Sequence, residues 1–168
     1  MTVTGSRVPD RRIVAAEELR LLLRRRATQV TVVTTAAGDR PVGFTATSFT
    51  SVSLRPPIVS FCLDRGSSSW PAVATAGHVA VHLLDAGQAA LARTFAAGGV
   101  DRFAAPVAWR TGPYGMPLLD GVLAWLVCRV AQRITVGNHA IVLGEPIATE
   151  HGDGAPLLYH NGEYAALA

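Results

Sequence analysis

Strand-length apolar runs recur along the chain, and helical segments interrupt them only irregularly. Runs rich in β-branched residues predict strands at 29–36, 58–64, 78–85, 121–136 and 140–150. Asn161-Gly162 predicts a two-residue turn within a terminal hairpin at 156–167. A parallel βαβ fold would alternate strands and helices regularly, so the pattern favours an antiparallel sheet closed into a barrel with helical excursions.

Helices are predicted at 15–26, 67–76 and 87–97. The first has acidic residues early and the run Arg24–Arg26 late, an order that suits the helix dipole. The second begins with serines that can cap it, and Pro71 falls in its first turn. The third places Leu91 and Phe95 four residues apart, which turns both toward the core.

Length and composition favour one compact domain. The chain has 168 residues, of which 49% are hydrophobic and 16% charged. We expect a flexible N-terminal tail at 1–14 and a single domain at 15–168. A charged fraction this low also favours an apolar surface shared in a homo-oligomer.

Several function classes are disfavoured. Although the net charge is +3 and the basic residues are all arginines, no base-stacking aromatics interleave with them, which argues against nucleic-acid binding. The N-terminus lacks the apolar segment of a secretory signal, and no run is long enough for a membrane helix. The sequence therefore predicts a cytoplasmic protein that does not bind membranes.

Motifs for metal, nucleotide and hydrolytic sites are also lacking. Cys62 and Cys128 have no spacing typical of metal ligands and are expected to be buried free thiols. The chain has no GxGxxG, Walker A or GxSxG motif, and its histidines show no HExxH spacing. An enzyme of this kind would take its chemistry from an organic cofactor.

Small hydroxyl side chains crowd the stretch GFTATSFTSVSLRPP, residues 43–57. They are Thr45, Thr47, Ser48, Thr50, Ser51 and Ser53. Such a stretch is either a solvated strand edge or a segment whose hydroxyls and backbone N–H groups hold an anion such as a phosphate.

In the order of its segments the chain resembles the flavin reductase domain found in the small components of two-component flavin monooxygenases. The resemblance covers Leu22 to Leu167, and its most specific part is T-x-x-S-F-x-S-V-S-L-x-P-P. The other segments are ATQVTVVTT (27–35), HVAVHLLDAGQAALARTFA (78–96) with DRF (101–103), GNHAIVLGE (137–145) and PLLYHNGEY (156–164).

The resemblance implies a mainly β, antiparallel Greek-key split β-barrel that forms a homodimer. It also implies an NAD(P)H:flavin oxidoreductase that transfers hydride from NADH or NADPH to FAD or FMN and needs no metal. The reduced flavin would then diffuse to a partner flavin-dependent monooxygenase.

The resemblance also implies where the flavin lies. The positions that match those lining the isoalloxazine ring are Thr45, Ala46, Thr47 and Ser48. The positions that match the ribityl and phosphate side are Ser51, Val52, Ser53 and Leu54. Arg102, in the DRF segment, is expected to offset the phosphate charge. The run Arg24–Arg26 is interpreted as a solvated helix end, or alternatively as placing Arg25 or Arg26 near a flavin phosphate.

His139 and Tyr159 are the residues expected to contact NADH. His139 would position the nicotinamide nucleotide, and no residue is assigned as an acid catalyst, because Asn138 stands where family members often have aspartate. The alternatives are a structural hydrogen bond for His139 and core packing for Tyr159.

Two other functions remain open: a flavin store or sensor without turnover on the same fold, and a nucleic-acid-binding barrel. The sequence decides neither FAD against FMN nor NADH against NADPH.

Overall fold

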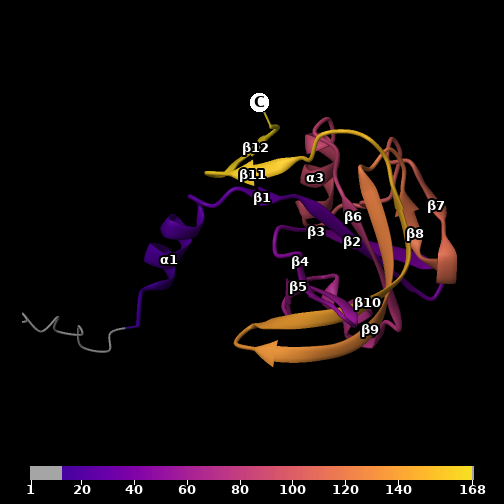
Figure 1. The fold of residues 1–168 in the computed structure, drawn as a ribbon, viewed down its shortest axis with the longest axis horizontal. Coiled ribbons are helices and arrows are strands. Elements are labelled where there is room, and N and C mark those ends of the chain that lie inside the picture. The colour runs from indigo at the N-terminus through magenta and orange to yellow at the C-terminus, as the bar shows by residue number, and fades with distance from the viewer. Residues whose placement is uncertain (1–12, 168) are drawn as a thin grey trace, which may run out of the picture.

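The structure is a computed structural model that describes residues 13–167, which are mainly β with short helices (Figure 1). The helices are α1 (Ala16–Leu23), α2 (Trp70–Thr75), α3 (Ala89–Ala96) and the 3-10 helix η1 (Pro113–Gly115). The strands are β1 (Thr28–Gln29), β2 (Thr31–Ala37), β3 (Arg40–Ala46), β4 (Thr50–Leu54), β5 (Pro57–Asp64), β6 (His78–Leu83), β7 (Trp109–Thr111), β8 (Pro117–Leu119), β9 (Ala124–Val136), β10 (His139–His151), β11 (Leu158–His160) and β12 (Glu163–Ala165). The predicted tail, residues 1–14, lies outside the described residues except for Ile13 and Val14.

One seven-stranded antiparallel sheet dominates the molecule, in the order β3-β2-β6-β9-β10-β5-β4. The sheet curls, so β3 and β5 contact each other although they are far apart in this order. Phe44 of β3 and Phe61 of β5 bring their ring centroids to 6.0 Å across this closure. The predicted mainly β, antiparallel class with helical excursions is therefore confirmed.

The core fills the inside of the curled sheet and a second region beneath α3. The first region holds Val33, Phe44, Phe61, Val79, Val81 and Val142. The second gathers Val30, Leu84, Phe95, Leu119 and Leu157. Phe95 is fully buried, as its spacing predicted, whereas Leu91 is only half-buried at the edge of the same region. Burial of these side chains, at about 1.5–3 kcal/mol each, is the main stabilisation of the barrel.

A long two-stranded arm, β9 and β10, runs beyond the barrel (Figure 1). Its pairing shifts register between Leu143 and Gly144 and again between Pro146 and Ala148. Such bulges increase local twist and bend the arm. At Gly144 a Cβ atom would lie 2.8 Å from the Cβ of Cys128, so only glycine allows the two strands to approach this closely.

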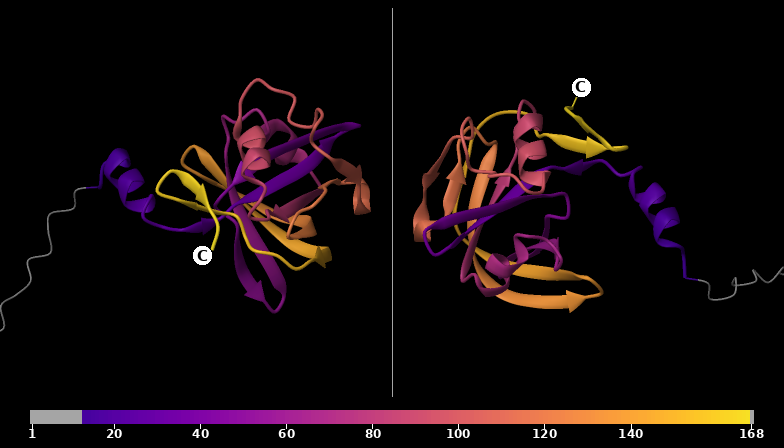
Figure 2. Two further views of the ribbon diagram at one scale, coloured as in Figure 1. Left: turned by 90° about the horizontal axis from the view of Figure 1, so that it is seen from above. Right: turned by 180° about the vertical axis from the view of Figure 1, so that it is seen from behind.

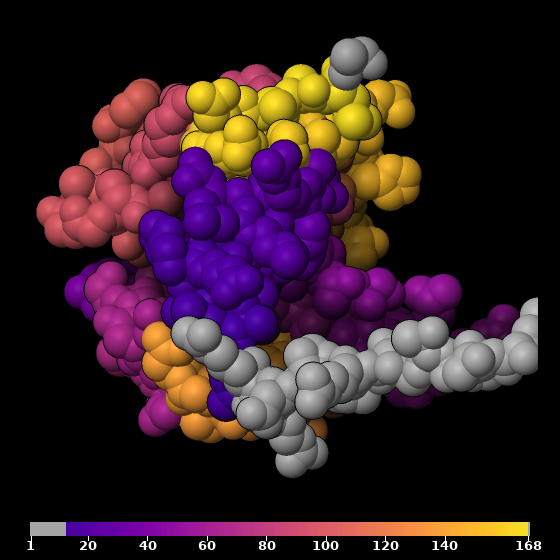
Figure 3. Space-filling model, turned by 90° about the vertical axis from the view of Figure 1, so that its left-hand side faces the viewer, coloured from indigo at the N-terminus to yellow at the C-terminus, as the bar shows by residue number. Residues whose placement is uncertain are grey.

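The terminal hairpin is confirmed. Asn161 and Gly162 both have positive φ values, 53° and 89°, as a type I′ turn requires. The hairpin joins β1 in a three-stranded sheet, β1-β11-β12, at the edge of the barrel. Viewed from that side, α1 and β1 lie directly beside the hairpin (Figure 3).

The predicted serine at the start of the second helix is confirmed, but its expected capping hydrogen bond is wrong. Ser69 occupies the N-cap position, but its side chain makes no capping hydrogen bond. Its hydroxyl instead donates to the carbonyl oxygen of Gly43 at 3.3 Å and accepts an N–H from Arg102 at 3.0 Å. A long-range partner has therefore replaced the local one. Pro71 does fall in the first turn of α2, as expected.

The segment 109–119 forms β7, η1 and β8, and none of these elements was predicted. α1 stands to one side of the barrel and buries no side chain (Figures 1 and 2). Across residues 13–167, no helix combines the length and apolar character needed to cross a bilayer.

Candidate functional site

Two neighbouring clefts open beside the end of β3, and Thr47 and Ser48 line both. The first, called here the β3–β5 cleft, has a volume of about 420 Å³. It is lined by Thr45, Ala46, Thr47, Ser48, Arg102 and His139, among others. The second, called here the helix–hairpin cleft, has a volume of about 560 Å³ and lies between α1 and the β11–β12 hairpin. Segments that are far apart in the sequence thus meet at one place.

The hydroxyls at the end of β3 hold the backbone of the β3–β5 cleft in place. Ser48 Oγ accepts the N–H of Cys62 at 2.8 Å and donates to the carbonyl oxygen of the same residue at 3.3 Å. Thr45 Oγ1 donates to the carbonyl oxygen of Ala92 at 2.6 Å. These bonds fix the segment against β5 and α3, while Thr47 stays exposed and free to contact a ligand.

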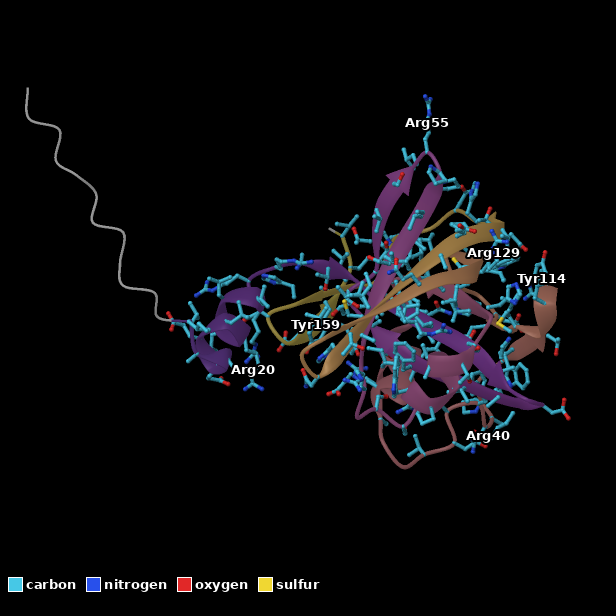
Figure 4. All side chains as sticks on the ribbon, turned by 90° about the horizontal axis from the view of Figure 1, so that it is seen from below. Arg20, Arg40, Arg55, Tyr114, Arg129 and Tyr159 are labelled. Carbon is cyan, nitrogen blue, oxygen red and sulfur yellow. The ribbon has the colours of Figure 1, made fainter. Side chains whose placement is uncertain are left out.

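Ser51, Val52, Ser53 and Leu54 do not line the β3–β5 cleft. They lie on β4, the edge strand of the main sheet, in a hairpin whose tip carries Arg55 (Figure 4). Val52 sits at a register shift and is 54% exposed, and Leu54 is 81% exposed. The structure thus separates the residues expected on the ribityl and phosphate side from those expected around the ring.

Arg102 lines the β3–β5 cleft but uses most of its N–H groups within the protein. Its Nη1 donates to the carbonyl oxygen of Gly43 at 2.7 Å and to Ser69 Oγ at 3.0 Å. Its Nε and Nη2 donate to the carbonyl oxygen of Ala97 at 2.9 and 2.7 Å. Burial lowers the pKa of the guanidinium from its usual value. Arg102 therefore ties β3, α2 and the end of α3 together beside the cleft.

His139 enters the β3–β5 cleft from the start of β10, opposite Asp64 of β5. Its Nδ1 lies 2.9 Å from Asn138 Oδ1, and because an amide oxygen only accepts, Nδ1 carries the proton. In the neutral form of the ring, Nε2 is then an acceptor. The carbonyl oxygen of Asn138 accepts the N–H of Arg65 at 2.9 Å, which holds this turn against β5.

Tyr159 lines the helix–hairpin cleft rather than the β3–β5 cleft. It lies on β11 opposite Thr28, and its ring centroid is 5.3 Å from that of Tyr164. Burial raises the pKa of Tyr164, which the nearby Tyr159 reinforces and Arg93 above the ring opposes. The two residues expected at NADH thus line different clefts, which have Thr47 and Ser48 in common.

Sequence reasoning assigned no role to His82, yet this side chain is fully buried in β6. Its Nδ1–H donates to the carbonyl oxygen of Val32 at 3.0 Å, and its Nε2 accepts the N–H of Leu119 at 3.2 Å. Burial lowers the pKa of His82 to about 4, so the imidazole is neutral at neutral pH. The only indication in the sequence that His82 would be buried was its position in an otherwise apolar strand.

The thiols differ from each other. Cys128 is buried, and burial raises its pKa to about 12. Cys62 is half-buried and lines the β3–β5 cleft. The expectation of burial is thus confirmed for Cys128 and only partly for Cys62. Among residues 13–167, no group of three histidine, cysteine or carboxylate side chains gathers as a metal site.

Comparison with known proteins decides the family. Residues 23–168 match the model of the flavin reductase like domain. The chain belongs to this flavin reductase family. The resemblance inferred from the ordered motifs is thereby confirmed, and its extent agrees with the matched residues to within one position at each end.

Individual relatives of this flavin reductase agree in length and fold. An NADH:FMN oxidoreductase from Rhodococcus erythropolis is 44% identical over 156 residues, which are 90% of this chain and 81% of the relative. The reductase subunit of a flavin-dependent monooxygenase from Mycobacterium tuberculosis is 35% identical, over 83% of this chain and 76% of that protein. The structure of an NADH:FAD oxidoreductase from Streptomyces globisporus, in complex with NAD and FAD fragments, matches with a TM-score of 0.86 and 36% identity, over 94% of this chain and 97% of that one. The split-barrel class is thus confirmed.

Proposed function

We propose that the chain is an NAD(P)H-dependent flavin reductase whose flavin lies in the β3–β5 cleft. The observation that carries this proposal is that Thr45–Ser48, Arg102 and His139, from three separate segments, line one cleft. The resemblance to the flavin reductase family implied that these residues contact the flavin and the nicotinamide nucleotide. In the reaction, NADH and a proton convert oxidised flavin to reduced flavin and NAD⁺, with hydride passing from nicotinamide C4 to flavin N5.

The residues of the β3–β5 cleft fit a flavin ring. Ala46 and Thr47 are small, so a planar ring can approach the backbone between β3 and β5 closely. Thr47 adds an exposed hydroxyl, and Arg102 still has one N–H without a partner in its set of bonds. Donors of this kind suit the carbonyl oxygens and ring nitrogens that a flavin presents.

His139 and Tyr159 are the proposed contacts for the nicotinamide nucleotide. The free Nε2 of His139 can accept an N–H from the carboxamide, which orients the nicotinamide ring over the cleft. Most of the acceleration then comes from positioning, because hydride transfer requires two rings at short distance and correct orientation. Ser51, Val52, Ser53 and Leu54 are proposed for the ribityl and phosphate side, reached along the edge strand β4.

We further propose that the chain acts as a homodimer. The exposed apolar residues of α1 and β4 support a second copy of the chain as the partner of this surface; they are Leu19, Leu21, Leu22, Val52 and Leu54. The single domain proposed for 15–168 is supported by bonds between Arg24 and Asn161, which join the segment after α1 to the β11–β12 hairpin. Reduced flavin would be delivered by diffusion to a partner monooxygenase, as relatives named as reductase subunits of monooxygenases suggest.

The test is NADH oxidation by the purified protein with FAD, FMN or no added flavin, repeated with NADPH. Saturable turnover that depends on added flavin is expected. Copurified flavin that NADH cannot reduce would overturn the proposal in favour of a flavin store.

A further inference from the structure

Arg133 joins strand β9 to the C-terminal end of α2. Its Nε donates to the carbonyl oxygen of Val73 at 2.9 Å, and its Nη2 donates to the carbonyl oxygen of Ala76. The last carbonyl groups of a helix have no partner within the helix, and a cation suits that end of the helix dipole. Within the described part of the chain, no carboxylate forms an ion pair with Arg133. The guanidinium is thus committed to α2.

The Arg133 guanidinium is partly withdrawn from water at this contact. The side chain is half-buried, and burial lowers the pKa of its guanidinium from the usual value. Desolvation of a cation is costly unless hydrogen bonds compensate for it, and here the two carbonyl oxygens of α2 do so. The contact is therefore a specific link between β9 and α2, unlike that of an arginine lying loosely on the surface.

The opposite end of α2 borders the β3–β5 cleft. Ser67, in the turn 67–69 before the helix, lines this cleft, and its hydroxyl accepts the N–H of Ser69 at 3.2 Å. The hydroxyl of Ser69 in turn accepts an N–H from Arg102. Two arginines from distant parts of the chain thus hold the two ends of this helix. Arg102 holds the end at the cleft, and Arg133 holds the end away from it.

Little else fixes the orientation of α2. The helix has six residues, no side-chain cap, and Val73 as its one buried side chain. At about 1.5 Å per residue it is short, and a helix of this length depends on tertiary contacts for its stability. A helix anchored by one buried valine can pivot about that side chain when one end is released. Release of the C-terminal end would then move the turn 67–69 at the other end, where Ser67 faces the cleft.

We propose that Arg133 is a positioning residue for the flavin, because it fixes α2 and so sets where the turn 67–69 stands at the wall of the β3–β5 cleft. Arg133 does not line the cleft and acts only through α2. His139 is held separately, because β10 pairs with β5 from His139 to Gly144. Loss of the Arg133 contact should therefore weaken flavin binding and spare the nicotinamide nucleotide. This inference rests on the proposed flavin reductase function and gives a residue outside the cleft a role in it.

The test is Arg133→Gln, which removes the charged donor and the planar fork. The dissociation constants of FMN and FAD, from fluorescence titration, should rise at least ~5-fold, the loss expected when charge-assisted hydrogen bonds are broken. The KM for NADH should stay within about two-fold of the wild-type value, since one direct hydrogen bond would already change it more. Hydrogen–deuterium exchange of the protein without flavin should be faster in residues 67–76. Arg133→Lys keeps the charge and should give intermediate dissociation constants.

The matched control is Arg129→Gln. Arg129 lies on the same strand, and its replacement removes the same charge, but this side chain is exposed and pairs with Glu145 instead of α2. Its flavin affinity and its exchange in residues 67–76 should match those of the wild type. Unchanged flavin affinity in Arg133→Gln with a lower melting temperature would show a merely structural role and overturn the inference. Equal weakening of flavin binding by the two substitutions would overturn it as well.

If Arg133→Gln does not fold, Arg133→Lys decides between the outcomes. Weaker flavin binding with faster exchange in residues 67–76 would support the inference, and wild-type values for both would overturn it. A wild-type protein that binds neither FMN nor FAD would instead reject the proposed function. Hydrogen exchange in residues 67–76 would then still show whether Arg133 positions the turn, because that measurement needs no flavin.

Discussion

Asn138 Oδ1 accepts the Nδ1–H of His139 at 2.9 Å, so a neutral amide sets the tautomer of the imidazole that faces the β3–β5 cleft. An aspartate at this position would make the same bond and add a negative charge. The amide makes the same hydrogen bond without adding a charge. Asn138 therefore acts only by orienting the imidazole of His139.

Replacing Asn138 with alanine should therefore raise the KM for NADH about 2- to 10-fold, the value of one neutral hydrogen bond. Steady-state kinetics at saturating flavin measures this. In a His139→Ala background, Asn138→Ala should have no further effect, because it acts through the imidazole. Independent, additive effects of the two substitutions would contradict this positioning role.

The stability of the protein should fall in mild acid because of His82. Its folded-state pKa is about 4, below the usual 6.5, so the unfolded chain takes up the proton first as the pH falls. The stabilisation is complete above pH 6.5 and is lost between pH 6.5 and 4, by up to about 3 kcal/mol.

Chemical denaturation of the wild type and of His82→Gln across this pH range measures the effect. The difference between the two isolates His82 from the carboxylates, which titrate in both proteins. A constant difference from pH 7 to pH 4 would contradict the prediction.

Arg102→Gln should lower the free energy of unfolding by about 2–4 kcal/mol, since it leaves the carbonyl oxygens of Gly43 and Ala97 without their charged donor. Arg102→Lys should recover little of this loss, because an ammonium cannot reach the same partners with a planar fork. Urea unfolding of the three proteins provides the measurement. Full recovery of the free energy of unfolding with lysine would show that the positive charge beside β3, and not the planar shape of the guanidinium, provides the stabilisation.

Ser48→Ala should cost about 1–2 kcal/mol of stability and raise the KM for flavin, because the segment loses both bonds to the backbone of Cys62. Ser51→Ala is the matched control for stability, since this serine is exposed on β4. Its melting temperature should stay at the wild-type value. Equal destabilisation by the two substitutions would rule out the proposed anchoring by Ser48.

Leu22→Arg should shift the proposed homodimer toward the monomer. The side chain is 66% exposed on α1, and a charge there would be buried by a second copy of the chain. Sedimentation velocity over a range of concentrations measures the change. Val100→Arg, on a loop and 53% exposed, should leave the oligomeric state unchanged. A wild-type protein that stays monomeric would exclude the homodimer.

Local sequence signals predicted strands β2, β5, β6, β9 and β10, the Asn161-Gly162 turn and the burial of Phe95, because each depends on near neighbours. Strands β3, β4, β7 and β8 were not predicted. The outcome at Ser69 differed because Arg102, far away in the sequence, provides a charged partner that outweighs a helix N–H. The same limit applies to His82, whose two partners lie on β2 and β8.

The two clefts show the same difference between what could and what could not be predicted from the sequence. The family resemblance implied that Thr45–Ser48, Arg102 and His139 lie near the flavin and the nicotinamide, and these residues do line one cleft. Ser51–Leu54, which it also implied for the flavin, do not line this cleft. Sequence alone did not indicate that Tyr159 lies with the arginines of α1 in another, because that depends on how the terminal hairpin pairs with β1.

The contrast between the thiols makes the protein convenient to label. Cys128 is sealed in the core and stays protonated, so alkylating reagents should leave it intact while the protein is folded. Cys62, at the wall of the β3–β5 cleft, is the more accessible sulfur. A maleimide dye would therefore attach a reporter at the wall of the β3–β5 cleft without any engineered cysteine.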